Sequence, residues 1–434
     1  MSKPELLFWI CMGLVAYNYL GYPLVLFLLS TLAQAKSDLM FLLHRGGRRC
    51  SPPNAYLPRV AILMAAHNEE AVIQAKVRNT LETDYPHDRL EFLIGLDSPT
   101  DSTADLLGQI TYDQVHVTHF ENRRGKLAVL TSLAHQTSAE ILVITDANTR
   151  LEPNCIPNLV RHFAEPRVGA VSGEESRVSA PGSDAAAEGL YWRYESALKL
   201  LENRLDCTLG GNGSVLAVRR SLFQPRKLTI VEDFQIPLEI RLKGYRVIYD
   251  PEAVAVEEIA PTLSAQFARR VRIGAGNYQT LFANLQCLNP LKGLLAFCFF
   301  SHRVLRWLAP ALLLVAFGSN MLMVGQGHFS ILLAVQSAFY VSASLGYLFK
   351  KLGEPMRLFS VPLHFCLMNL AMFLGLIRYV TGEQKLIWSS TPRCVEIEST
   401  MTHGESNGMR QTTGGAQQPT VKTDSRGARA FQST

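Results

Sequence analysis

Apolar residues are concentrated at the two ends of this chain, and its middle is polar and charged. Residues 6–33 are almost uncharged, and residues 307–324, 329–349 and 358–377 form further apolar stretches. A helix needs about 20 apolar residues to cross a bilayer, so each stretch is long enough to span one. The pattern predicts an integral membrane protein with a polar domain placed between its first and its later spans.

The first apolar stretch has two readings. Residues 33–35, Ala-Gln-Ala, resemble a signal-peptidase site, but the apolar run far exceeds the ~7–15 residues of a cleaved leader. We therefore expect a transmembrane helix within residues 1–35. The linker over residues 36–58 contains Lys36, Arg45, Arg48 and Arg49. Basic flanks of this kind remain on the cytoplasmic side, so we expect the polar domain to be cytoplasmic, in a bacterial inner-membrane type of arrangement.

In the middle of the chain, residues 59–288, short apolar runs alternate with segments of helical periodicity. The predicted strands are 60–65, 90–96, 115–120 and 141–145, and the predicted helices are 71–81, 103–110 and 126–135. Strands that alternate with helices form a parallel sheet covered on both faces, so the pattern predicts an α/β domain. Neither G-x-G-x-x-G after the first strand nor a P-loop is present, which argues against a dinucleotide fold or a P-loop nucleotidase.

Composition excludes other classes of protein. The chain has 434 residues, of which 48% are hydrophobic, and a formal net charge of +5. Part of the basic excess flanks the apolar stretches, so it fits membrane orientation and not nucleic-acid binding. The eight cysteines are scattered singly without a C-x-x-C pair, which suggests neither a zinc site nor a disulfide framework.

Polar residues follow the predicted strands where ligands bind in α/β proteins. Asp97 and Asp146 each end a strand, and the carboxyl ends of strands in an open sheet border the ligand site. Asp146 with Asn148 suits a hard divalent cation that holds phosphates, although an Asx turn also explains this pair. Lys126 begins a helix, where helix amides and a lysine favour an anion. Together these residues indicate a nucleotide-diphosphate site.

Seven short motifs, in order along the chain, carry a resemblance to a known family. They lie at 60–70, 97–103 (DSPTDST), 124–130 (RGKLAVL), 146–148 (DAN), 210–214 (GGNGS), 231–233 (VED) and 269–273 (RRVRI). Each resembles a motif of the family 2 glycosyltransferases, and the layout with membrane helices is similar to cellulose, hyaluronan and poly-N-acetylglucosamine synthases. The resemblance extends from Val60 to Arg393.

The resemblance implies a fold and roles for individual residues. It implies a GT-A-type, Rossmann-like mixed sheet domain flanked by transmembrane helices. Asp233, next to Glu232, would be the base that deprotonates the acceptor, while Asp146 and Asn148 would hold Mg²⁺ or Mn²⁺. The nucleotide sugar, expected to be UDP-linked, would be bound by Glu69, Asp97, Lys126, Asp146, Arg269 and Arg272. Without the family pattern, Glu232 and Asp233 are equally well explained as first-turn acids that stabilise a helix.

Two positions depart from the family pattern. Asn148 stands where aspartate is more usual, and Ile273 stands where processive members have tryptophan. Isoleucine has no ring face on which an acceptor sugar can stack. Arg269 and Arg272 lie one helical turn apart, so they could clamp a pyrophosphate or lie on anionic lipid as part of a basic amphipathic helix.

These observations lead to one expected function and two alternatives. We expect an inverting transferase that moves a sugar from a nucleotide sugar to a growing polysaccharide at the cytoplasmic membrane face. The alternatives are a single addition to a membrane lipid, which Ile273 favours, and a non-catalytic nucleotide-sensing scaffold.

The expected structure of the C-terminal part follows from its apolar stretches. Residues 289–393 are expected to form a helix at 294–305, interfacial or entering the membrane, and three spans. Residues 394–434 are expected to form a disordered tail.

Overall fold

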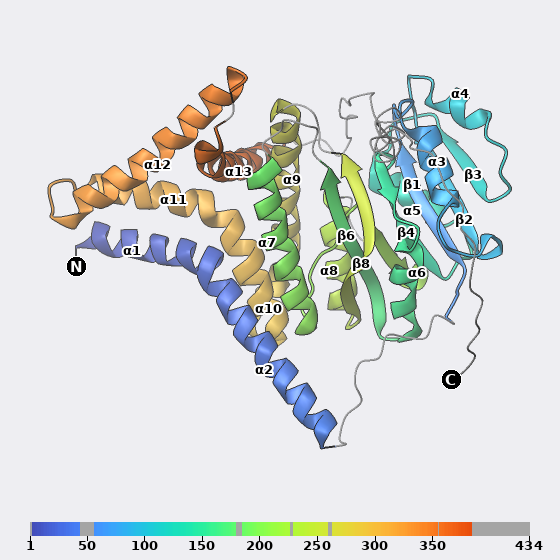
Figure 1. The fold of residues 1–434 in the computed structure, drawn as a ribbon, viewed down its shortest axis with the longest axis horizontal. Helices are drawn as coiled ribbons and strands as arrows, with labels where there is room; N and C mark the ends of the chain where they lie inside the picture. Colours follow the sequence, from blue (N-terminus) through green and yellow to red (C-terminus); the bar gives the residue numbers. More distant parts are fainter. Residues whose placement is uncertain are drawn as a thin grey trace, which may run out of the picture. The chain divides into compact units, whose positions relative to one another are not determined.

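A computed structural model describes residues 2–43, 56–178, 185–225, 229–258, 263–354 and 356–383. Most of the predicted basic linker, residues 44–55, lies outside the described residues, and so does the predicted tail, residues 394–434. The polar middle of the chain forms a sheet with covering helices, and long apolar helices precede and follow it (Figure 1).

The sheet has eight strands in the order β3-β2-β1-β4-β7-β6-β8-β5. The strands are β1 Val60–Ala66, β2 Leu90–Asp97, β3 Val115–Phe120, β4 Ile141–Ile144, β5 Thr149–Leu151, β6 Val168–Val178, β7 Leu216–Arg219 and β8 Arg246–Glu258. The four predicted strands are confirmed, and β1 to β4 pair in parallel, with Val60 opposite Leu90 and Ile141. The mixed sheet that the resemblance implies is also confirmed, because β7 pairs antiparallel with β4 and β6, and β5 pairs antiparallel with β8.

Helices cover both faces of this mixed sheet. They are α3 Ile73–Leu81, α4 Thr103–Gly108, α5 Lys126–Ala134, α6 Cys155–Val160, α7 Ala185–Arg204, α8 Glu232–Leu242 and α9 Leu263–Ala283. Short 3-10 turns occupy His87–Arg89, Arg161–Ala164, Arg220–Leu222, Leu285–Leu288 and Pro290–Lys292. Alternate residues of β1 enter two different apolar cores, with Ile62 and Met64 on one face and Leu63 on the other. A strand buried on both faces in this way explains the uninterrupted apolar run.

Among the described residues, four helices are long and apolar enough to cross a membrane. The first, Lys3–Leu42, consists of α1 Lys3–Ala16, a π turn at Tyr17–Gly21 and α2 Tyr22–Leu42. The second, Leu294–Met321, consists of α10 Leu294–Cys298, a π turn at Phe299–Val304 and α11 Leu305–Met321. The others are α12 His328–Lys351 and α13 Arg357–Thr381. The predicted separate helix at 294–305 is thus continuous with the following span, because no residue between them breaks the helix.

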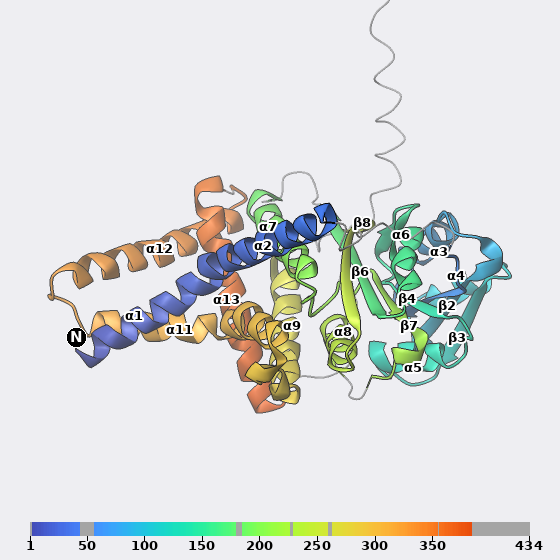
Figure 2. The same cartoon turned by 90° about the horizontal axis from the view of Figure 1, so that it is seen from below.

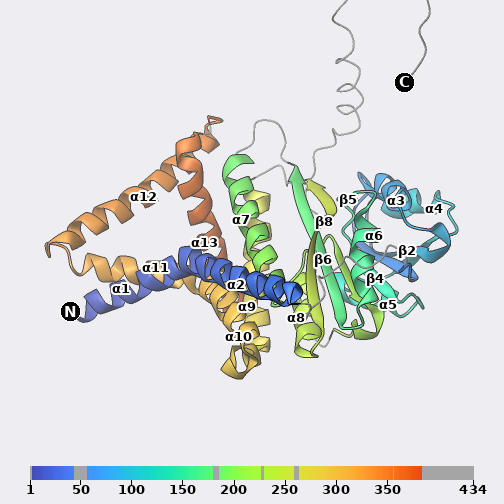
Figure 3. The same cartoon turned by 60° about the horizontal axis from the view of Figure 1, so that its bottom comes forward.

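The apolar helices pack against the sheet domain through α7 and α9. α1 runs along α11 and α2 packs on α7 (Figures 2 and 3). The two π turns meet where the Tyr17 hydroxyl lies 2.9 Å from Ser301 Oγ. α13 crosses α9 at Gly375, where an added Cβ would lie 2.8 Å from the Gly274 Cα. Only glycine permits such a close backbone approach, so this crossing fixes α9 against a candidate membrane span.

Candidate active site

The centre of the site is a lysine between two acids from separate elements. Asp146 follows β4, Glu232 begins α8 and Lys126 begins α5. Lys126 Nζ lies 2.7 Å from Asp146 Oδ1 and 2.5 Å from Glu232 Oε1. Burial lowers the pKa of Lys126, but the carboxylates of Asp146 and Glu232 outweigh this effect and raise the pKa well above its usual range. The predicted residues at the sheet edge and the VED motif therefore form one charged centre.

Asp233 is a partly buried carboxylate at the start of α8. Its side chain has no hydrogen-bond partner within the described residues. Burial, followed by the negative charges of Glu232, Glu175 and Asp146, raises the pKa of Asp233 to about 6, although Lys126 opposes the shift. A carboxylate with such a pKa is mostly ionised at pH 7 and is more basic than an ordinary aspartate, as a general base requires.

The glycine-rich loop at residues 210–214 packs directly on Asp233. The Gly211 amide donates a hydrogen bond of 2.8 Å to the Asp233 carbonyl oxygen. An added Cβ on Gly213 would lie 3.4 Å from the Asp233 Cβ. The GGNGS motif therefore lies directly against Asp233.

Asp97 is fully buried, and its carboxylate holds the loop before α5. It accepts hydrogen bonds from the backbone amides of Arg124 (2.6 Å) and Gly125 (3.1 Å) and from Arg123 Nε (3.2 Å). Gly125 has a φ of +89°, which favours glycine at this turn. Asp97 was expected to contact the nucleotide directly, but neither of its carboxylate oxygens is exposed in this structure. In this structure Asp97 positions the loop that leads to Lys126.

The loop after β1 is tied to the loop after β2. The Glu69 amide donates to Thr103 Oγ1 at 2.8 Å, and His67 Nδ1 lies 3.0 Å from the Asp97 carbonyl oxygen. Both side chains are buried. Glu69 and Asp97 therefore lie at the same sheet edge, as expected, and this edge is held rigid by contacts between the two loops.

Arg269 and Arg272 differ in their surroundings although both lie on α9. Arg269 donates to Glu257 Oε1 at 2.8 Å. Burial lowers the pKa of Arg272, which also lies within electrostatic range of Glu232, Asp146 and Asp233. Arg272 is therefore oriented toward the acidic centre, whereas Arg269 is engaged by Glu257.

Asp146 and Asn148 provide a small set of oxygen ligands for a cation. Asn148 Nδ2 donates to Glu257 Oε1 at 3.1 Å, which leaves its Oδ1 as an acceptor. No group of three or more histidines, cysteines or acids that could hold a metal is found in the described part of the chain. Mg²⁺ is commonly held by one or two carboxylates together with substrate phosphates, so these residues fit a cation bound jointly with a nucleotide diphosphate.

Three charged residues of the site were not predicted from the sequence. Lys76 on α3 is buried, and its Nζ donates to Thr145 Oγ1 (2.9 Å) and to the Thr149 carbonyl (2.6 Å) on either side of Asp146. Burial lowers the pKa of Lys76 to about 7. The spacing of Lys76 in the sequence could have predicted its burial, because Lys76 lies on the same face of α3 as the apolar residues Ile73 and Val77.

The other two unpredicted residues are Glu175 on β6 and Glu257 on β8. Glu175 pairs with Arg177 at 2.5 Å and accepts a hydrogen bond of 3.0 Å from Ser214 Oγ. Burial raises the pKa of Glu175, but Arg177 and the other partners outweigh it and lower the pKa to about 2. Arg177 is a local partner of Glu175 on β6, but the contacts with Ser214 and of Glu257 with Arg269 and Asn148 join separate elements, so the residue pattern did not mark these acids as part of the site.

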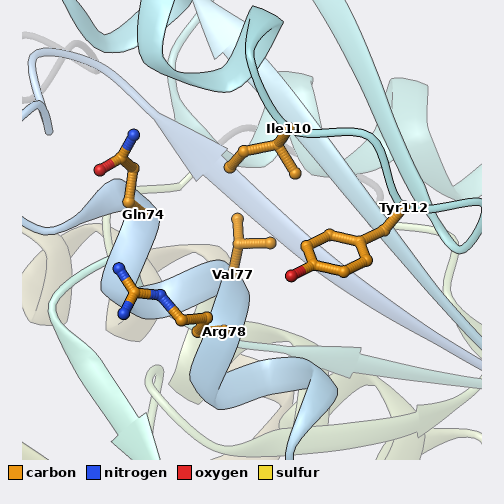
Figure 4. Close-up of a pocket in the computed structure, with 5 residues that line it drawn as sticks. All are labelled: Gln74, Val77, Arg78, Ile110 and Tyr112. Carbon is orange, nitrogen blue, oxygen red and sulfur yellow. The ribbon is translucent and has the colours of Figure 1, made fainter.

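Two cavities lie away from this charged centre. One, of about 150 Å³, is lined by Gln74, Val77, Arg78, Ile110 and Tyr112 (Figure 4). The other, of about 310 Å³, lies between α8 and the turns after α9. None of the predicted site residues lines either cavity, so neither is a candidate for the reaction site.

Residues 61–224 match the family described as glycosyl transferase family 2. A probable glycosyltransferase YdaM of Bacillus subtilis is 25% identical over 54% of this chain and 59% of its own length. The beta-monoglucosyldiacylglycerol synthase of Synechocystis is 27% identical over 58% of this chain and 55% of its own length. A poly-beta-1,6-N-acetyl-D-glucosamine synthase of Staphylococcus aureus is 26% identical over 52% of this chain and 56% of its own length. The chain thus spans little more than half the length of these relatives.

A solved structure shows the same fold over most of the chain. The mannosyltransferase PcManGT from Pyrobaculum calidifontis, in complex with GDP-Man and Mn²⁺, has a TM-score of 0.67 and 21% identity. The match covers 87% of this chain and 99% of that chain, so it includes both the sheet domain and apolar helices. The family match identifies residues 61–224 as a glycosyl transferase family 2 domain, and the described part of the chain also contains four helices long and apolar enough to span a membrane.

Proposed function

We propose that this chain is an inverting glycosyltransferase that uses a nucleotide sugar and acts at a membrane surface. The observation that carries the proposal is Asp233, whose pKa is raised to about 6 beside the charged centre of Asp146, Lys126 and Glu232. A glycosyl transfer needs a base that deprotonates the acceptor hydroxyl and a charged site that stabilises the leaving diphosphate. Asp233 would be the base, and the charged centre beside it would bind the diphosphate.

Binding of the donor would use the charged centre. Lys126 and Arg272 would interact with the diphosphate, which carries the negative charge that these cations favour. Asp146, with Asn148 Oδ1, would hold Mg²⁺ or Mn²⁺, which neutralises the leaving diphosphate. Glu232 would keep Lys126 in position through their ion pair of 2.5 Å.

The transfer step would use Asp233 as the general base. The acceptor hydroxyl attacks the anomeric carbon from the face opposite the diphosphate, and its proton passes to the Asp233 carboxylate. The bond between the anomeric carbon and the diphosphate oxygen breaks with its electron pair, so the configuration of the sugar inverts. General bases of this kind contribute typically 10²- to 10⁴-fold to the rate.

We further propose a UDP-linked donor, a cytoplasmic domain and a polysaccharide acceptor. Basic residues Lys36, Lys350 and Lys351 lie near the ends of candidate spans that are expected to face the cytoplasm. A relative that is a poly-beta-1,6-N-acetyl-D-glucosamine synthase supports the polymer as acceptor.

A second candidate function is a single addition to a membrane lipid. Ile273 packs against the apolar cluster that contains Tyr22 and Phe234, and it offers no ring on which a growing sugar chain can stack. A relative that is a glycolipid synthase supports the same candidate. A non-catalytic scaffold would not need the raised pKa of Asp233.

The test is transfer of label from a panel of radiolabelled nucleotide sugars. Membranes containing the full chain are incubated with each donor and with Mg²⁺ or Mn²⁺. Label retained on a filter as polymer supports polysaccharide extension, and label extracted into organic solvent supports a lipid acceptor. Nucleotide binding without transfer from any donor would overturn the enzymatic proposal.

A further inference from the structure

His302, Arg303 and Arg306 lie on the candidate span Leu294–Met321 near the sheet domain. His302 Nδ1 lies 2.5 Å from Glu202 Oε1, and Arg306 forms an ion pair with Glu195. Arg303, between them, is different: it has neither an ion pair nor a hydrogen bond with any residue in the described ranges, and its Nε is buried. The charge of Arg303 is therefore available to a ligand.

Arg303 lies against the same structural unit as the proposed base. Its guanidinium carbon is 5.0 Å from the centre of the Phe234 ring, and Phe234 directly follows Asp233. An added Cβ on Gly210 would lie 3.7 Å from an Arg303 terminal nitrogen. The adjacent Gly211 amide bonds to the Asp233 carbonyl oxygen. Arg303 and Asp233 thus contact the same short loop, and Arg303 reaches it from a candidate membrane span.

A second cation strengthens the positive potential at this loop. Lys199 on α7 is buried, and its Nζ donates to Asn212 Oδ1 at 2.6 Å. Burial lowers the pKa of Lys199, and the nearby Arg303 lowers it further, while Glu174 and Glu175 oppose both effects. The positive charge of Lys199 is thus partly balanced by the negative charges of Glu174 and Glu175.

Glu202, the acid with which Arg303 interacts at longer range, already has other hydrogen-bond partners. Glu202 lies within electrostatic range of Arg303, but its Oε1 accepts hydrogen bonds from the Tyr22 hydroxyl at 2.7 Å and from His302. A partly buried guanidinium without a hydrogen-bonded partner is costly. The π turn at Phe299–Val304 that carries Arg303 is also a rare conformation, found frequently at functional sites.

The chemistry of arginine defines the ligand. A guanidinium binds phosphate oxygens in a bidentate way, and it is less suited to a neutral sugar. Because Arg303 belongs to a candidate membrane span, the phosphate available to it is that of a lipid headgroup. Lys126 and Arg272, which interact with Asp146, are in contrast placed for the donor diphosphate.

We propose that Arg303 binds the phosphate ester of a membrane lipid acceptor and so places the lipid hydroxyl beside Asp233. This inference rests on the proposed transferase function in its second candidate form, a single addition to a membrane lipid, and it specifies that lipid as anionic. Arg303 is a specificity-determining residue in this proposal, and Asp233 remains the base.

The first measurement is lipid binding by the purified full chain in detergent. Native mass spectrometry compares short-chain phosphatidylglycerol with diacylglycerol of the same chains for wild type, Arg303→Gln, Arg303→Lys and Arg204→Gln. Arg204 is an exposed arginine at the end of α7 and serves as the matched control. We expect a preference of about tenfold or more for the phospholipid, which corresponds to ~1.4 kcal/mol. Arg303→Gln should lose this preference for the phospholipid, Arg303→Lys should keep part of it, and Arg204→Gln should keep all of it.

Two results of this measurement would overturn the proposal. An unchanged preference in Arg303→Gln would show that Arg303 does not bind the headgroup. Displacement of the phospholipid by an equal concentration of inorganic phosphate would show a site for free phosphate and not for a lipid. Partial retention in Arg303→Lys guards against misfolding as the explanation, because this variant keeps the charge.

The second measurement separates this inference from the proposed function. Radiolabelled nucleotide sugars are added to the same proteins in nanodiscs that contain either phosphatidylglycerol or diacylglycerol in a neutral phosphatidylcholine bilayer. Transfer that favours phosphatidylglycerol in wild type, but not in Arg303→Gln, is the expected result. Equal transfer to both lipids by wild type would overturn the acceptor assignment and leave the transferase function intact. Absence of transfer by wild type from every donor would overturn the function and the acceptor role together.

Discussion

The ammonium group of Lys126 lies 2.7 Å from the Asp146 carboxylate, at the oxygen proposed to hold a divalent cation. The lysine and the cation therefore compete for this oxygen. Replacing Lys126 by methionine should increase the affinity of the nucleotide-free protein for Mn²⁺ about fivefold, since a partly exposed ion pair contributes up to about 1 kcal/mol. The same variant should bind UDP more weakly.

Electron paramagnetic resonance of free Mn²⁺ measures the first effect, and titration calorimetry with UDP measures the second. Lys351→Met, at the exposed end of α12, is the matched control. Unchanged Mn²⁺ affinity in Lys126→Met would mean that the cation does not bind at Asp146.

Asp233→Asn should abolish sugar transfer. The amide cannot accept the acceptor proton, so we expect a loss of at least about 100-fold in kcat, with the affinity for nucleotide nearly normal. Initial rates of label transfer and UDP binding are measured on the same preparation. Asp113→Asn replaces an exposed aspartate before β3 and should retain full activity. Substantial transfer by Asp233→Asn would remove Asp233 from the role of base.

The pH dependence of the reaction should report the raised pKa of Asp233. Its folded-state pKa of about 6 means that the carboxylate becomes protonated as the pH falls below 6. The rate constant kcat/KM should therefore decrease about tenfold per pH unit below that value. A profile that stays flat down to pH 5 would contradict the assignment.

The contribution of Asp233 to folding stability should decrease as the pH rises, whereas the activity should increase over the same pH range. The pKa of Asp233 is raised from 3.8 in its ordinary state, so the native protein binds this proton more tightly than the unfolded chain. The stabilising contribution is fully present below about pH 4 and is lost as the pH rises through 6. Asp233→Asn should accordingly raise the Tm at pH 7.5, and the gain should shrink toward pH 5. Thermal unfolding at both values measures this, and a lower Tm at pH 7.5 would contradict it.

Divalent cations should be required for transfer. Chelation by EDTA should stop the reaction, and added Mn²⁺ or Mg²⁺ should restore it, because the leaving diphosphate needs neutralisation. In Asp146→Ala the restored rate should remain at least about 100-fold lower than in wild type. Full activity in the presence of EDTA would sink the Asp146 assignment.

Gly375→Ala should separate α13 from α9. The added Cβ would lie 2.7–2.8 Å from backbone atoms of Gly274 and Ala275, which cannot rotate away. We expect destabilisation by about 1–3 kcal/mol and a lower transfer rate, because α9 carries Arg269 and Arg272. Gly318→Ala is the matched control, since nothing lies within 4 Å of its Cβ. Equal Tm values for the two variants would contradict this packing.

The local pattern predicted the part of the fold that is continuous in the chain. β1 to β4 and the helices between them alternate over residues 60–144, and the apolar runs of β1, β2 and β4 are buried as expected, whereas the edge strand β3 is mostly half-exposed. β7 could not be predicted in this way, because its antiparallel place beside β4 depends on a partner 72 residues or more away in the sequence. β5 has only three residues and carries no periodicity.

The candidate site was predicted by residue type but not by side-chain contacts. Asp146, Lys126 and Glu232 were expected at one site and lie together. Asp97 was expected to face the ligand, yet burial and three hydrogen bonds direct it inward. Such directions depend on backbone amides that belong to another loop, and these are not visible in the residue pattern. Glu257 was missed for the same reason.

The contact between Tyr22 and Glu202 has a practical consequence for protein production. Tyr22 is fully buried on the first helix, and its hydroxyl donates to a carboxylate of the sheet domain. A recombinant fragment starting at residue 59 would leave Glu202 short of a donor and would uncover the apolar cluster around Leu26. Expression trials aimed at a water-soluble catalytic fragment should therefore yield aggregated or inactive material, and the full-length chain in detergent is the form to purify.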